Sequence, residues 1–95
     1  MIIGILEVIL YLPESHSLKG KRQVIKSIKD KVRSRFNVSI AEIEYLDLWQ
    51  KAGLAVCTVG NDRSRINGQL DQVINFIDRL QVATDIDTQI ELMDY

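Results

Sequence analysis

Two stretches of this chain are apolar on both of the faces that a β-strand presents. They run from Ile2 to Leu12 and from Gly53 to Val59, and Glu7 is the single charged residue in either stretch. A strand with two apolar faces is typical of the centre of a sheet, because a half-exposed strand alternates apolar and polar residues. Pro13 lacks the N–H that would continue a β-ladder, so the first strand is expected to end there.

An amphipathic helix is predicted after each of these strands. The first begins at Ser17, a good N-cap, and ends near Asn37, a residue that tolerates the left-handed conformation. Its core-facing seam consists of Leu18, Val24, Ile25, Ile28, Val32 and Phe36. The second covers about residues 63 to 80 and is capped by Asn61 or Asp62. Its apolar residues repeat at helical spacing at Ile66, Leu70, Val73, Ile77 and Leu80.

Two further strands complete the pattern. The strand from Val38 to Glu44 is predicted to place Ser39, Ala41 and Ile43 on one face and Val38, Ile40, Glu42 and Glu44 on the other. The last strand alternates Ile86, Thr88, Ile90 and Leu92 with polar residues. The order strand, helix, strand, strand, helix, strand predicts an α+β, ferredoxin-like βαββαβ sandwich. We expect a single domain over residues 1–95, with a four-stranded antiparallel sheet and both helices on one of its faces.

Composition excludes several classes of protein. The chain has 95 residues, of which 46% are hydrophobic and 26% charged, as in an ordinary globular domain. The N-terminal apolar run is far shorter than the roughly 20 residues that span a bilayer, and neither a basic region nor a cleavage site flanks it. A cytoplasmic protein without membrane contact is therefore expected. The single cysteine, Cys57, allows no disulfide framework and is predicted to be a small buried hydrophobe.

The sheet face opposite the helices is predicted to mix acids with isoleucines. Its polar members are Glu7, Tyr11, Glu42, Glu44, Asp87, Gln89 and Glu91. One aromatic among acids argues against RNA binding across the sheet, because RNA-reading sheets display several aromatics beside basic residues. The apolar members are Ile3, Ile5, Ile9, Val38 and Ile40. An uncovered patch of this kind usually meets another surface, so a homodimer through this face is weighed against a monomer.

Basic residues concentrate in the first helix. Eight of the chain's twelve lysines and arginines lie between Ser15 and Asn37, so residues 1–40 carry a net charge of +5 and residues 41–95 a net charge of −6. Positive charge at a helix N-terminus is locally unfavourable, which makes sense if an anion binds there. The residues hypothesised to bind RNA or another anion are Ser17, Lys19, Lys21, Arg22, Lys26, Lys29 and Arg33. The alternative is an ordinary solvated helix face.

No catalytic or metal constellation is apparent. His16 has no acid at a spacing that would orient it and no second histidine with which to bind a metal, so a surface role is expected. An acylphosphatase-like activity would need a glycine-rich loop with an arginine, where this chain has LPESHSLKGKR. We therefore expect no enzyme, no metal and no cofactor. Trp49 is either a local packing anchor or a contact for a partner.

Four segments carry a resemblance to a known family. SLKGKR (17–22), RFNVSIAEIE (35–44), DLWQKAGLAV (47–56) and VGNDR (59–63) together resemble the YlxP-like family, a bacterial domain of unknown function. The resemblance implies a ferredoxin-like fold and signature positions at Ser17, Leu18, Lys19, Lys21, Arg22, Phe36, Asn37, Ser39, Glu42 and Trp49. Family members are often encoded near initiation factor two and ribosome-binding factor A. This implies work on RNA or the ribosome, and it carries over no catalytic residue.

Two functional hypotheses follow from these observations. The first is a non-enzymatic module that binds RNA through the basic helix, with ribosomal RNA as the partner that the gene neighbourhood implies. The second is a homo-oligomeric scaffold or small-ligand-binding module with no role in nucleic-acid binding.

Overall fold

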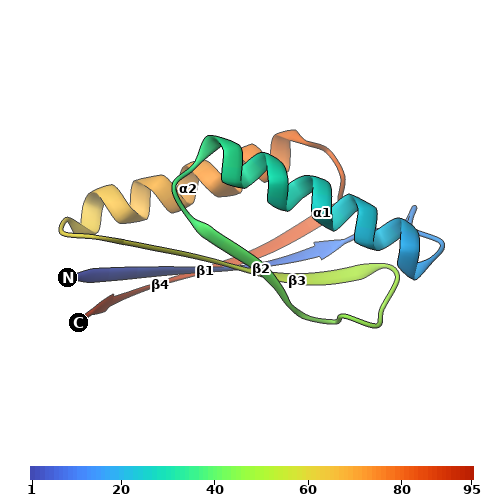
Figure 1. The fold of residues 1–95 in the computed structure, drawn as a ribbon, viewed down its shortest axis with the longest axis horizontal. Helices are drawn as coiled ribbons and strands as arrows, with labels where there is room; N and C mark the ends of the chain where they lie inside the picture. Colours follow the sequence, from blue (N-terminus) through green and yellow to red (C-terminus); the bar gives the residue numbers. More distant parts are fainter.

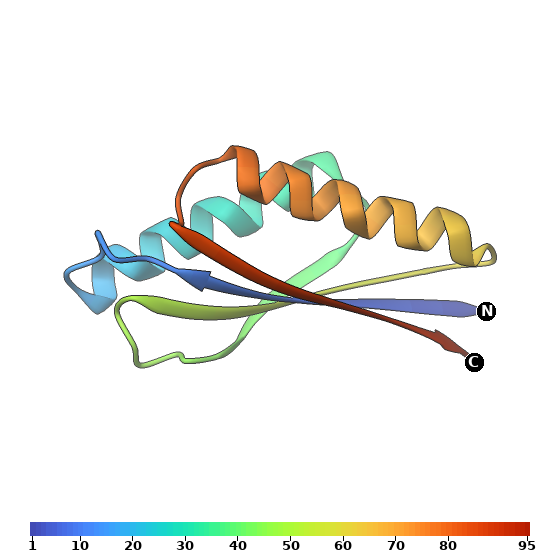
Figure 2. The ribbon, with the colours of Figure 1, turned by 180° about the vertical axis from the view of Figure 1, so that it is seen from behind.

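The computed structural model describes residues 1–95 as six elements in the predicted order. They are β1 (Ile2–Tyr11), α1 (Leu18–Arg35), β2 (Ser39–Glu44), β3 (Lys51–Gly60), α2 (Arg63–Arg79) and β4 (Asp85–Asp94). The strands form one antiparallel sheet in the order β2-β3-β1-β4. Both helices lie on the same face of this sheet (Figure 1), and the view from behind shows the other face uncovered (Figure 2). This is the predicted ferredoxin-like α+β fold, with β1 and β3 at the centre.

The core lies between the sheet and the two helices. Even-numbered residues of β1 are buried against the helices, and odd-numbered residues point to the open face. Sixteen buried apolar residues form one cluster that draws on every element except β4, whose Ile86, Ile90 and Leu92 pack against it. Gly4 lets α2 approach β1 closely, because a methyl group at this position would overlap Cγ2 of Ile66.

The helix starts are as predicted and one helix end is not. The Ser17 hydroxyl accepts a hydrogen bond from the Gly20 N–H at 2.9 Å, and the Asp62 carboxylate accepts one from the Arg65 N–H at 3.1 Å. The prediction that Asn37 ends α1 in the left-handed conformation is wrong. The chain instead leaves the helix at Phe36 through extended backbone with φ −126°, while the Phe36 N–H still bonds to the helix.

The structure confirms that Val38, Ile40 and Glu42 at β2 share one face, but the prediction that this face lies on the open side of the sheet is wrong. Ile40 is only 2% exposed and belongs to the core, and Val38 packs against that core. Glu42 also points toward the helices, where it meets α1. A β-bulge between Glu42 and Glu44 then changes the register, so that Glu44 lies over Gly53 on the open face. Val38 and Ile40 therefore cannot belong to a dimer surface on the open face.

Two loops that carry candidate residues meet at one end of the molecule. The β1–α1 loop and the β2–β3 loop lie together at the end opposite the chain termini (Figures 1 and 2). They are joined by hydrogen bonds from the Gln50 side-chain amide to the carbonyls of Pro13, at 3.0 Å, and Ser15, at 3.2 Å. The Leu12 N–H also donates to the Gln50 carbonyl at 2.9 Å. This network holds the start of α1 beside the β2–β3 loop.

Candidate nucleic-acid interface

The outer face of α1 is strongly cationic. The helix contains eight basic residues and one acid, Asp30, and its apolar seam of Ile25, Ile28 and Val32 is buried against the sheet. Seven of the eight basic residues reach solvent. The fold therefore exposes most of the cationic stripe that the sequence predicted, on the flank of the helix beside β2.

Lys21 is the exception, and its assignment to an exposed anion site is wrong. It is fully buried, with its ammonium 2.8 Å from Oε2 of Glu42, and it donates a hydrogen bond to the Tyr45 carbonyl at 2.6 Å. The ammonium is close to Oε2 of Glu42 but is not aligned to donate a hydrogen bond to it. The two charges therefore form an ion pair without a hydrogen bond. An ammonium that is buried and whose charge is balanced by Glu42 cannot bind phosphate. Lys21 instead ties α1 to β2 and to the β2–β3 loop.

Three further predicted site residues already have partners within the chain. The Ser17 hydroxyl is occupied by the helix cap. Arg33 donates to the Ile40 carbonyl at 2.9 Å, which covers part of the β2 edge. Lys26 pairs with Asp30 at 2.8 Å, although its side chain remains 76% exposed. The hydrogen bond from Lys26 lowers the pKa of Asp30 below its ordinary value, and the nearby charges of Lys26, Arg33 and Lys29 act in the same direction.

Several cations of α1 remain without an acidic partner. From the predicted set these are Lys19, Arg22 and Lys29. Lys31 and Arg35 also lack one, but they lie about half a turn round the helix from Arg22, on its other flank. The Arg35 guanidinium lies 5.1 Å from the centre of the Phe76 ring, which orients it toward α2. Lys19, Arg22 and Lys29 lie to one side of the apolar seam. Lys21 does fall on that seam, three residues after Leu18 and four before Ile25.

The two layers of the fold carry opposite charge. Alternation along the strands places five acids and one lysine on the open sheet face, which are Glu7, Glu44, Asp85, Asp87, Glu91 and Lys51. Tyr11 is held among them by a 3.2 Å hydrogen bond from its hydroxyl to Asp87. An anion is therefore repelled from the sheet face and attracted to the helix layer. This distribution agrees with the argument against RNA binding across the sheet.

The open face also carries apolar side chains. Ile3, Ile5 and Ile9 lie on it as predicted, and Val59 and Met93 flank Ile3 on the neighbouring strands. Cys57 lies opposite Ile5 on this face and is exposed, so the prediction of a buried cysteine is wrong. The reason is that the helices cover one face of β3 only.

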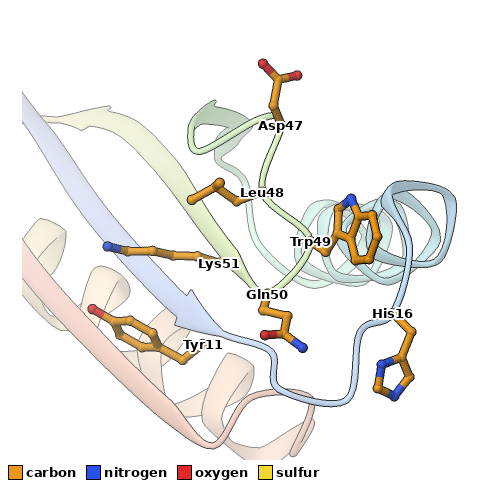
Figure 3. A pocket seen from close by; sticks show the side chains of 7 residues that line it. All are labelled: Tyr11, His16, Asp47, Leu48, Trp49, Gln50 and Lys51. Carbon is orange, nitrogen blue, oxygen red and sulfur yellow. The ribbon is translucent and has the colours of Figure 1, made fainter.

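An open hollow of about 690 Å³ lies at the end of the molecule where the two loops meet. Figure 3 shows the side chains that line it: Tyr11, His16, Asp47, Leu48, Trp49, Gln50 and Lys51. Trp49 is 53% exposed, so about half of its surface is open to solvent and available to a partner. The Lys51 ammonium is 4.1 Å from the centre of the Tyr45 ring and 5.5 Å from that of Tyr11. The hollow is thus lined both by the exposed ring of Trp49 and by the Lys51 ammonium, which lies against the rings of Tyr45 and Tyr11.

The described residues offer neither a metal centre nor a nucleophile with its base. No three His, Cys, Asp or Glu side chains gather closely enough to hold a metal ion. No carboxylate forms an ion pair or hydrogen bond with His16, which lines the hollow from the β1–α1 loop. Neither helix combines the length and the apolar composition that crossing a membrane requires.

Comparison with known proteins identifies relatives along most of the chain. Residues 3–90 match the family described as "Protein of unknown function (DUF503)". The chain is 40% identical over 76 residues to the "Uncharacterized protein YlxP" of Bacillus subtilis (strain 168), a match that covers 80% of this chain and 83% of the relative. Among solved structures it is similar to the "De novo designed protein Foldit4", with a TM-score of 0.55 and 12% identity over 99% of this chain and 97% of the other. This last likeness concerns the fold alone.

Proposed function

Because the chain belongs to the DUF503 family, whose YlxP-like members the sequence segments resembled, we propose from its geometry that it is a cytoplasmic, non-enzymatic RNA-binding module whose binding surface is the outer face of α1. The observation that carries the proposal is the exposed surface of α1, where seven cations face solvent against one acid. RNA is favoured over DNA by the translation-gene neighbourhood that the resemblance implies. Ribosomal RNA is accordingly the expected partner.

The chemistry of the surface sets the mode of binding. Lysine and arginine side chains along one helix contact phosphates, which give affinity without reading sequence. Lys19, Arg22 and Lys29 are the best candidates, since none of them is engaged by an acid. The open sheet face is acidic, so the RNA should approach from the helix side only.

The test compares two triple variants of equal charge. Replacing Lys19, Arg22 and Lys29 with glutamine changes the net charge from −1 to −4, and replacing Arg63, Arg65 and Arg79 on α2 makes the same change. Binding to ribosomal subunits and to naked RNA is measured by cosedimentation across a salt series. We expect the α1 variant alone to lose most of its affinity, and the slope of log K against log salt to fall in magnitude by about 2. Equal effects of the two variants, or affinity that is independent of salt, would refute an α1 site.

A homodimer through the open face is the second candidate function. It is favoured by the uncovered apolar side chains there, among which Val59 is 62% exposed. Sedimentation equilibrium over a wide concentration range tests it, together with an Ile5→Lys variant, because Ile5 lies among those side chains. A dimer that the variant abolishes would support this scaffold role. A monomer at the highest concentration would exclude it.

A further inference from the structure

The hollow beside α1 is lined by the indole ring of Trp49, which stands on a loop that is held at both ends. The β2–β3 loop that carries it is held at one end by Lys21, which donates to the Tyr45 carbonyl, and at the other by Gln50, which bonds to the β1–α1 loop. A further bond runs from the Leu48 N–H to the Tyr45 carbonyl at 3.1 Å. A loop tied down in this way has little conformational freedom left to lose when a ligand binds. Trp49 is thus an exposed ring on a loop whose backbone is already tied down.

The surroundings of Trp49 indicate what would bind there. Figure 3 shows that Trp49 and His16 come from different loops and lie on the same side of the hollow, while Lys51 and Tyr11 lie across it from them. The Asp47 carboxylate points away from this group. An exposed aromatic face is a platform for a planar ring, and stacking of a nucleobase on such a face is a general mode of binding to single-stranded nucleic acid.

The hollow is also connected to the cationic face of α1. His16 lines it, and Lys19 follows three residues later, which is at most roughly 10 Å of chain. A strand whose phosphates lie along Lys19, Arg22 and Lys29 would therefore reach the hollow at the start of the helix. An enclosed metabolite site would be walled on most sides, whereas this hollow is open to solvent and suits one base of a longer chain.

We propose that the hollow receives an unpaired base of the bound RNA, which stacks on Trp49. This inference rests on the proposed function, and it specifies the class of ligand as single-stranded or looped RNA. Bases in an A-form duplex are stacked and paired, so they cannot enter the hollow. Duplex RNA should bind through phosphate contacts alone.

The chain contains one tryptophan, so its fluorescence reports on this site directly. Two probes are used, a fluorescein-labelled oligoadenylate of about 12 nucleotides, within the usual range of single-strand site sizes, and a blunt RNA duplex of the same length. Anisotropy of the label measures total binding, and Trp49 emission measures stacking. The variants are Trp49→Ala, Trp49→Phe as the conservative replacement, and Leu46→Ala as the control. Leu46 is on the same loop and is also 53% exposed, but it does not line the hollow.

We expect the single strand to quench Trp49 with the same midpoint as the anisotropy change. Trp49→Ala should weaken single-strand binding by about 5- to 100-fold, as expected for one stacked base, and leave duplex binding and the salt slope unchanged. Trp49→Phe should retain most of the affinity, and Leu46→Ala should bind like the wild type. Unfolding midpoints in urea confirm that each variant is folded.

Two results would overturn the inference, and they are distinguishable. Salt-dependent binding of both probes with no change in Trp49 emission and no effect of Trp49→Ala would remove the stacking site and leave the α1 function in place. If neither the single strand nor the duplex binds at low salt, the α1 function and the stacking site are both removed.

Discussion

Replacement of Lys21 by methionine tests whether this lysine is part of the fold or part of a binding surface. Methionine keeps the length and the packing of the side chain but removes the ammonium. Its loss leaves the Glu42 carboxylate, whose side chain is 12% exposed, without a countercharge, and leaves the Tyr45 carbonyl with the Leu48 N–H as its donor. The carboxylate is then largely buried without a partner, and removing one member of a buried pair costs more than replacing both.

The expected destabilisation is about 3 kcal/mol, at the lower end of the roughly 3–5 kcal/mol for breaking a buried ion pair, because some solvent reaches Glu42. The double variant Lys21→Met/Glu42→Leu removes both charges and should lie within about 1–2 kcal/mol of the wild type, since apolar replacement of a buried pair is often tolerated. Glu42→Leu alone should cost at least about 1 kcal/mol, because it leaves the buried Lys21 ammonium without its countercharge. The coupling energy between the two sites should therefore be at least about 2 kcal/mol.

Urea unfolding followed by far-ultraviolet circular dichroism measures these energies. With an m-value of about 1 kcal/mol/M for a domain of this size, Lys21→Met should lower the midpoint by about 3 M. Lys26→Met is the matched control on the same helix, because Lys26 is largely exposed and solvent screens its pair with Asp30, so the midpoint should move little. A loss below about 1 kcal/mol in Lys21→Met, or a cycle that is additive within about 0.5 kcal/mol, would refute the structural role.

Two further predictions concern packing and charge. Gly4→Ala should destabilise the protein by about 1–3 kcal/mol, because the added methyl overlaps Ile66 and pushes α2 away from β1. Urea unfolding measures this change. An unchanged unfolding midpoint would contradict the prediction, because it would show that α2 can shift without loss of stability. The pKa of Asp30, followed by NMR, should lie below 3.8 and rise in Lys26→Met. Since the pKa is depressed in the folded state, the small stabilisation from Asp30 is present above its unfolded pKa and is lost as the pH falls through the folded pKa. An unchanged pKa in Lys26→Met would contradict the assigned cause.

Local patterns predicted the elements of the fold because those patterns depend on near neighbours. The two-sided apolar runs identified the central strands, and the helical spacing of Ile25, Ile28 and Val32 identified the face of α1 that is buried. Ser17 capped the helix as expected, because a hydroxyl at that position can reach the N–H three residues on. Each of these inferences needs information from within a few residues of chain.

The predictions that were wrong required knowledge of distant partners. Both faces of β2 mix polar and apolar residues, so its orientation depends on pairing with β3, and a shift of one residue exchanges the faces. Cys57 looked buried because its strand is apolar, but burial needs a second layer, and both helices pack on the other side.

Lys21 shows the same limit at the candidate site. Its sequence neighbours are lysine, glycine and arginine, which predict an exposed cationic turn, and its counterion lies 21 residues further along the chain. The sequence by itself determined the order of the elements, the central strands and the concentration of positive charge on α1, because periodicity and composition are local. Only the tertiary structure decided which of those cations face solvent, which face of β2 is buried and which loop stands beside α1, because each depends on contacts between residues far apart in the chain.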